Sequence, residues 1–151
     1  MAYMDWLRRH IRVTSTGRLV ALLLWLLFIW GNSCVSGDAS SSESLAFLEI
    51  IRPVFEALGI TDTHLMHTLV RKCAHFLEYL VLAVLAVRAL GASSVVVIVA
   101  FGLLAPCVDE TIQLFVPGRV GAITDVCIDA CGFATGALAC RLLSGRPDRS
   151  S

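Results

Sequence analysis

Four long apolar runs limit what this chain of 151 residues can fold into. The runs cover Leu19–Val35, Cys73–Leu90, Ala92–Val108 and Gly121–Leu143. Each is close to the roughly 20 residues that a helix needs to cross ~30 Å of hydrocarbon. Because apolar residues are continuous rather than alternating, they favour helices over the strands of a barrel. The sequence therefore predicts an all-α fold, a four-helix transmembrane bundle.

The composition agrees with a membrane environment and excludes several other classes. Hydrophobic residues make up 57% of the chain and charged residues 16%, against the usual ~45–50% and ~25% of soluble domains. Twelve Lys and Arg balance twelve Asp and Glu. This leaves no basic surplus, so no nucleic-acid partner is expected. Low net charge with high apolar content also excludes disorder.

Basic residues predict the orientation, because the cytoplasmic ends of spans are enriched in Lys and Arg. An arrangement with both termini inside puts eight arginines inside: Arg8, Arg9, Arg12, Arg18, Arg88, Arg141, Arg146 and Arg149. It leaves four basic residues outside: Arg52, Arg71, Lys72 and Arg119. We expect a multi-pass plasma-membrane protein, N-in and C-in, with a basic cytoplasmic segment 1–15, a transmembrane domain 16–143 and a cytoplasmic tail 144–151.

The first run also has features of a secretory signal peptide, since four arginines precede twelve apolar residues, Leu19–Trp30. No A-x-A-like cleavage site follows it, which favours a retained helix.

The segment between the first two spans divides into two parts. Ser36–Ser44 is rich in Ser and Gly and is expected to be a flexible connector. Leu45–Leu58 then places four apolar residues at helical spacing: Leu48, Ile51, Phe55 and Leu58. This predicts an amphipathic helix in the outer membrane interface, kinked or split into two turns at Pro53.

The six cysteines form no CxxC pair and lack zinc-finger spacing. They are expected to be small buried apolar residues. A disulfide among Cys34, Cys73 and Cys107 is the alternative.

Ionisable residues form a stripe along the second span. They recur at steps of three or four: His64, His67, Arg71, His75 and Glu78. Tyr79 lies beside this stripe. Ionisable groups inside a span are costly and usually face a partner or a cavity, so His75 and Glu78 indicate either a structural hydrogen-bonded pair or part of a ligand or catalytic site.

The third span ends, and the fourth begins, with further polar residues. Asp109 and Gln113 share a helix face, and Glu110 is adjacent. Arg119 follows a Pro-Gly turn and offers a planar cation for carboxylate or phosphate. The fourth span carries Asp125 and, one turn deeper, Asp129. Its Gly132 and Gly136 form a GxxxG pattern, which is typical of close helix packing.

These polar residues belong to ends of spans that the topology places on the same, outer side. They are expected to converge there on one extracytoplasmic site: His75, Glu78, Asp109, Glu110, Gln113, Arg119, Asp125 and Asp129.

Three motifs in order resemble the VanZ-like membrane protein family. They are Arg-Lys-x-x-His-Phe-x-Glu-Tyr-x-x-Leu at Arg71–Leu82, Asp-Glu-x-x-Gln-x-Phe-x-Pro-Gly-Arg at Asp109–Arg119 and Asp-x-x-x-Asp-x-x-Gly-x-x-x-Gly at Asp125–Gly136. The family name comes from an accessory protein associated with low-level resistance to the glycopeptide teicoplanin. The resemblance implies a multi-span cell-envelope protein. At Asp129 the family more often has Asn, so the resemblance does not carry a role to that residue.

Two main functions compete. The favoured one is an accessory module whose outer polar pocket binds an envelope lipid, a peptidoglycan precursor or a glycopeptide-type ligand, because no nucleophile is evident. The expected ligand-binding residues are Arg71, Lys72, His75, Glu78, Tyr79, Asp109, Glu110, Gln113, Arg119 and Asp125. The basic side chains among them, Arg71, Lys72 and Arg119, would bind anionic oxygens of the ligand.

The alternative is an intramembrane hydrolase or transferase acting on a lipid or polyprenyl-phosphate headgroup. Its candidate catalytic residues are His75, Glu78, Asp109 and Glu110, with His75 as general base and Glu78 orienting it. Asp109, Glu110 and Asp125 would then hold a divalent metal, although HxxE is too weak a signal to assign a metal site or a cofactor. A proton-coupled transporter ranks third, because four spans enclose a path only if the protein forms a homo-oligomer.

Overall fold

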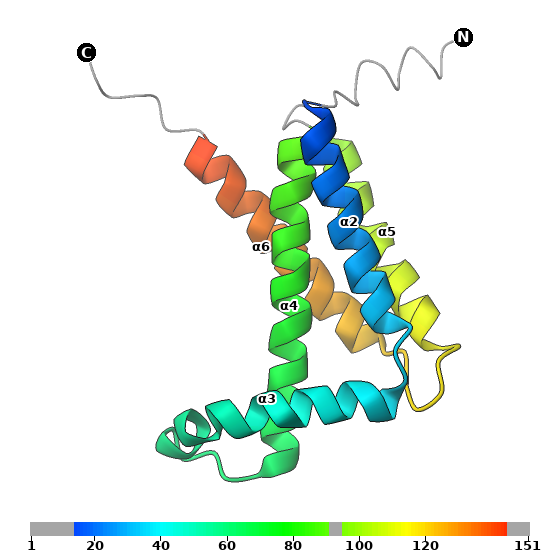
Figure 1. Cartoon of the computed structure of the whole chain (residues 1–151). Coiled ribbons are helices and arrows are strands. Elements are labelled where there is room, and N and C mark those ends of the chain that lie inside the picture. The colour runs from blue at the N-terminus through cyan, green and yellow to red at the C-terminus, as the bar shows by residue number, and fades with distance from the viewer. Residues whose placement is uncertain (1–13, 91–94, 145–151) are drawn as a thin grey trace, which may run out of the picture.

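The computed structural model describes residues 14–90 and 95–144, which form five α-helices (Figure 1). These are α2 (Thr16–Ser33), α3 (Gly37–Ala57), α4 (Thr63–Leu90), α5 (Val95–Gln113) and α6 (Ile123–Ser144). Helices α2, α4, α5 and α6 are long and apolar enough to span a membrane. The predicted all-α fold with four spans is confirmed. Nearly all of the predicted segments 1–15 and 144–151 lies outside the described residues.

The four long helices alternate in direction, so that half of their ends meet next to α3. The ends of α2 and α5 and the starts of α4 and α6 lie at this end, where α3 crosses the bundle (Figure 1). We call it the α3 end. Helix α4 begins at Thr63, ten residues before the predicted apolar run, because the polar stripe forms its first turns. This antiparallel arrangement brings the sequence-distant motifs to one end of the molecule.

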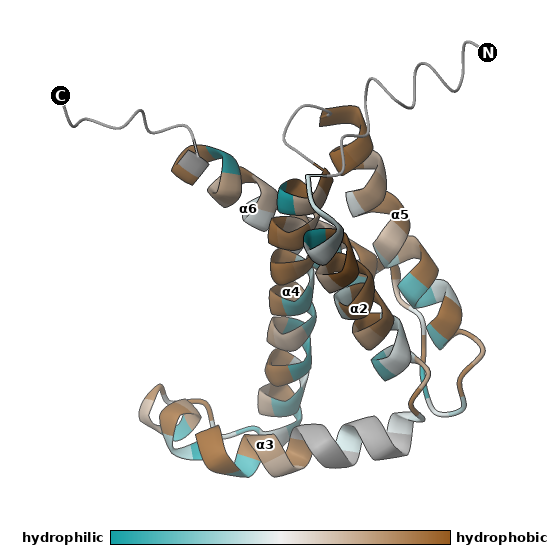
Figure 2. Ribbon diagram, turned by 45° about the horizontal axis from the view of Figure 1, so that its top comes forward, coloured by the Kyte–Doolittle hydropathy of each residue, from teal (hydrophilic) through white to brown (hydrophobic). Residues whose placement is uncertain are grey.

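The core is small, and much of the outer helix surface is apolar. Leu22, Leu26 and Ile29 of α2 are buried together with Tyr79 and Leu82 of α4. Exposed large apolar side chains cover the outside of the spans, among them Leu24, Leu27, Leu104 and Leu142. Figure 2 shows hydrophobic residues along these helices. Such a surface is suited to lipid rather than water.

Helices α4 and α6 approach each other at the two glycines of the GxxxG pattern. A Cβ atom at Gly132 would overlap the carbonyl oxygen of Phe76, and one at Gly136 would overlap that of Leu80. Both oxygens belong to the backbone of α4, so the helices touch along their main chains. The prediction that these glycines serve close packing is confirmed.

The predicted flexible connector at Ser36–Ser44 is wrong, because α3 already begins at Gly37. The Gly37 N–H donates to the Pro117 carbonyl over 3.0 Å, and a Cβ at Gly37 would overlap the carbonyl of Gly118. The start of α3 therefore packs on the connection between α5 and α6. This tertiary contact fixes a segment whose composition alone is typical of a linker.

Helix α3 is not split at Pro53 but continues to Ala57. Leu48, Ile51 and Phe55 lie on both sides of Pro53 and pack against the start of α4, at Met66 and Val70. This shared contact supports the helix across the hydrogen bond that proline removes. The apolar stripe expected to meet the membrane thus packs largely on α4.

All six cysteines are free, so the disulfide alternative is not found. The expectation of burial holds only for Cys140, since the other five are exposed: Cys34, Cys73, Cys107, Cys127 and Cys131. Four of these five lie within spans, namely Cys73, Cys107, Cys127 and Cys131, where a small apolar side chain can contact lipid instead of the protein core.

Candidate functional site

Four ligand-type side chains from three helices meet inside the α3 end. His75 comes from α4, Asp109 and Glu110 come from α5, and Asp129 comes from α6. One nitrogen or oxygen atom of each lies within 4.8 Å of those of the other three. Asp109 and Asp129 are 0% exposed and Glu110 is 5% exposed. We call this group the carboxylate centre.

Hydrogen bonds from neighbouring elements position two of its carboxylates. The Ser33 hydroxyl, at the end of α2, donates to Asp109 Oδ1. Glu110 accepts from the Gln113 amide over 3.2 Å and from the Ala122 backbone N–H over 2.7 Å. Helix α2 and the connection before α6 therefore hold the acidic side chains of α5 in fixed orientations.

The remaining polar atoms of the centre are poorly satisfied. His75 Nδ1 lies 3.3 Å from Asp129 Oδ1, close enough for an ion pair when the imidazole is protonated. Within the described part of the chain, neither Asp129 oxygen nor Asp109 Oδ2 has a hydrogen bond. The hydroxyl of Tyr79, a fully buried residue, also has none. Buried polar atoms without partners are uncommon in native proteins and often mark a functional position.

Glu78 lies beside the centre but is not one of its four members. Its carboxylate accepts from the Asn32 amide over 3.4 Å, and its backbone carbonyl accepts from the Trp25 indole over 2.9 Å. The sequence pattern paired His75 with Glu78, whereas the nearest acidic partner of His75 among the described residues is Asp129. Glu78 instead ties α4 to α2.

Basic residues gather next to the carboxylate centre. Lys72 Nζ lies 2.7 Å from Asp125 Oδ1, joining α4 to α6. Arg119 donates to the carbonyls of Val35 over 3.0 Å and Asn32 over 2.8 Å. These bonds cap the end of α2. From the sequence, Arg119 was expected only to bind a carboxylate or a phosphate. Burial and the neighbouring Arg71 charge lower the pKa of Arg119 from its ordinary value.

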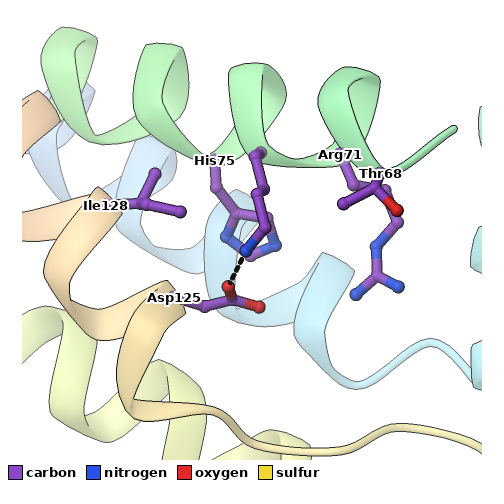
Figure 3. A pocket seen from close by; sticks show the side chains of 6 residues that line it. Thr68, Arg71, His75, Asp125 and Ile128 are labelled. Atoms are coloured by element: carbon purple, nitrogen blue, oxygen red, sulfur yellow. Dashed lines mark hydrogen bonds and ion pairs between the residues drawn. The ribbon is translucent and has the colours of Figure 1, made fainter. Parts of the chain in front are cut away.

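Two adjacent cavities open among these basic residues. One, of about 170 Å³, is lined by Thr68, Arg71, Lys72, His75, Asp125 and Ile128 (Figure 3). The other, of about 200 Å³, is lined by Gly37, Ser41, Arg71, Gly118, Arg119, Val120 and Asp125. Arg71 and Asp125 border both. We call the pair of cavities the cationic pocket.

The predicted site residues thus fall into two adjoining groups. His75, Asp109 and Glu110 enter the carboxylate centre, and Gln113 supports it. Arg71, Lys72, Arg119 and Asp125 line the cationic pocket. His75 belongs to both groups, while Glu78 and Tyr79 lie at the border with α2 and the core.

Sequence reasoning missed the contribution of α2. Asn32 and Ser33 donate to Glu78 and Asp109, yet in sequence they read only as the polar end of an apolar run. The sequence does contain a signal for them. Polar side chains near the end of a span need hydrogen-bond partners, as charged side chains do.

The helices and this site define a class: a small multi-pass membrane protein with a buried acidic centre and a cationic pocket at one end. Within that class, a sequence model of the VanZ/LLP1 family matches residues 18–144. The chain belongs to the VanZ/LLP1 family. Neither a curated protein nor a solved structure matches it.

Proposed function

We propose that this protein binds the phosphate-bearing headgroup of an envelope lipid in the cationic pocket. The observation that carries the proposal is the position of Arg71, which borders both cavities. Among the side chains that the structure describes, Arg71 makes no ion pair, whereas Lys72 is paired with Asp125. A guanidinium facing a cavity is suited to two parallel hydrogen bonds with a phosphate.

The surroundings of the pocket favour a lipid over a free anion. Helix α3 contributes Gly37 and Ser41 to the pocket lining. Its outward face exposes Phe47, Ile50 and Val54. An apolar face beside a cationic pocket would contact acyl chains while the headgroup binds inside. Lipid-linked peptidoglycan precursors share this phosphate chemistry and are therefore included in the ligand class.

Replacing Arg71 by Gln is expected to weaken binding of a phosphate lipid about 10- to 100-fold. Charge-assisted hydrogen bonds contribute roughly 1.5–3 kcal/mol, and ~1.4 kcal/mol is tenfold in affinity. Binding of short-chain phosphatidylglycerol and polyprenyl phosphate to the detergent-purified protein measures the effect, with phosphatidylcholine as the zwitterionic comparison.

Arg88→Gln is the matched control, because Arg88 is exposed at the opposite end of the same helix. It should leave the affinity unchanged. Equal losses in both variants would show a general charge effect and contradict the pocket. Release of the headgroup by the wild-type protein would instead favour the second candidate, a hydrolase or transferase, which His75 supports by lining both the pocket and the carboxylate centre.

We also propose that the α3 end faces outward, as the distribution of arginines indicates. In a protein whose six cysteines are replaced, Phe115→Cys should react with a membrane-impermeant maleimide added to intact cells. Leu143→Cys should react only after the membrane is opened. Phe115 is 83% exposed between α5 and α6, and Leu143 is 73% exposed near the other end. The reverse labelling pattern would show that the orientation is inverted.

A further inference from the structure

The carboxylate centre has more acidic groups than its described surroundings neutralise. It contains Asp109, Glu110 and Asp129, and its fourth member, His75, is its basic one. Two nearby cations are engaged elsewhere, since Lys72 pairs with Asp125 and Arg119 donates to carbonyls at the end of α2. Arg71 faces the adjoining cavities and makes no ion pair with a carboxylate of the centre among the described residues. Carboxylates buried in a membrane-spanning bundle are strongly unfavourable without a counter-charge. A bound cation would supply that charge.

Unpartnered oxygen atoms point to the same conclusion independently. Asp109 and Asp129 are both 0% exposed. Asp109 Oδ2 and both oxygens of Asp129 have no hydrogen bond among the described residues. Asp129 Oδ1 lies 3.3 Å from His75 Nδ1, which is itself a ligand-type atom of the centre. All three oxygens belong to the four groups that lie within 4.8 Å of one another, so a single ion could bind them together with the imidazole.

We propose that His75, Asp109, Glu110 and Asp129 bind a divalent transition-metal ion. Ligand atoms bound to a common ion at about 2.0–2.4 Å lie no more than about 4.8 Å apart, as these four groups do. The imidazole favours Zn²⁺ or another transition metal, and the carboxylates suit Mn²⁺. Metal sites in helical bundles are commonly built in this way, from inward side chains of facing helices.

The residues around the centre already orient two of the ligands. Ser33 holds Asp109 through Oδ1, which leaves Oδ2 for the ion. Gln113 and the Ala122 N–H hold the two oxygens of Glu110, each of which keeps a second lone pair. Hydrogen bonds of this kind fix metal ligands in many sites.

The structure thus assigns the metal to other residues than the sequence did. From the sequence, Asp109, Glu110 and Asp125 were the candidate ligands. Asp125 is paired with Lys72 and is not one of the four. Because His75 also lines the cationic pocket, the ion would lie at the wall of that pocket. The proposed metal site does not require the proposed lipid site. Lipid binding is tested separately, by comparing Arg71→Gln with the wild type after a chelator has removed any metal.

The test is equilibrium metal binding by the full-length protein purified in detergent. Chelator-treated protein is incubated with Zn²⁺, Mn²⁺, Mg²⁺ or Ca²⁺, freed of unbound metal and analysed by elemental mass spectrometry. Stoichiometric Zn²⁺ or Mn²⁺ is expected, together with a visible absorption band when Co²⁺ is added. Asp129→Asn, which removes the charge but keeps the shape, should weaken binding at least 10-fold.

Glu56→Gln is the matched control, because Glu56 is an exposed carboxylate of α3 that belongs neither to the centre nor to the cationic pocket, and it should bind metal as the wild type does. If Asp129→Asn fails to fold, His75→Gln and the Co²⁺ band of the wild type decide. The proposal is overturned by metal content equal to that of a detergent blank. It is also overturned by binding of Mg²⁺ or Ca²⁺ alone, or by equal losses in Glu56→Gln and Asp129→Asn.

Discussion

A methyl group at Gly132 is expected to destabilise the protein by at least about 1–3 kcal/mol, the usual cost of overpacking a tight contact. The added Cβ would overlap the Phe76 carbonyl, and a backbone atom cannot move aside as a flexible side chain can. Gly132→Leu is expected to abolish the folded protein. The thermal unfolding midpoint, measured by size-exclusion chromatography of heated detergent samples, reports both effects.

Gly31→Ala provides the comparison. Gly31 lies inside α2, and a Cβ there would meet nothing within 4 Å. This substitution should leave stability unchanged or raise it by about 0.5–1 kcal/mol, because alanine is the better helix former. If Gly132→Ala were as stable as Gly31→Ala, α4 and α6 would not meet along their backbones. His75 of α4 and Asp129 of α6 would then not be held together in the carboxylate centre.

The four spans could be predicted from the sequence because apolar length and continuity are set by the bilayer rather than by tertiary contacts. The convergence of His75 with Asp109 could be predicted as well, because an antiparallel topology fixes which span ends meet. The close packing of helices at Gly132 and Gly136 could likewise be predicted from the GxxxG pattern. Each of these inferences rests on periodicity or spacing along the chain.

Partner choice could not be predicted, because it depends on helix rotation. His75 and Glu78 are neighbours in sequence, yet His75 lies against Asp129 of another helix. Arg119 was expected to meet an anion, but it caps the end of α2. The start of α3 depends on the contact between Gly37 and the connection after α5. The composition of residues 36–44 does not indicate this tertiary contact.

Side chains from separate spans meet in one buried centre at the α3 end. The contact between Ser33 and Asp109 tests this meeting of spans, because it joins α2 to α5 through a carboxylate of that centre. Residues about 15 Å away along α5, which is ten residues at 1.5 Å each, should be out of reach. Val99 is such a residue, 52% exposed and ten positions before Asp109.

The measurement is cross-linking of Ser33→Cys with Asp109→Cys by a short bifunctional thiosulfonate, in folded protein whose six native cysteines are replaced. Intact mass spectrometry reads out the product. We expect nearly complete intramolecular cross-linking of this pair and none between Ser33→Cys and Val99→Cys. An uncross-linked Ser33→Cys and Asp109→Cys protein, or equal yields for the two pairs, would show that these spans do not meet at a common centre.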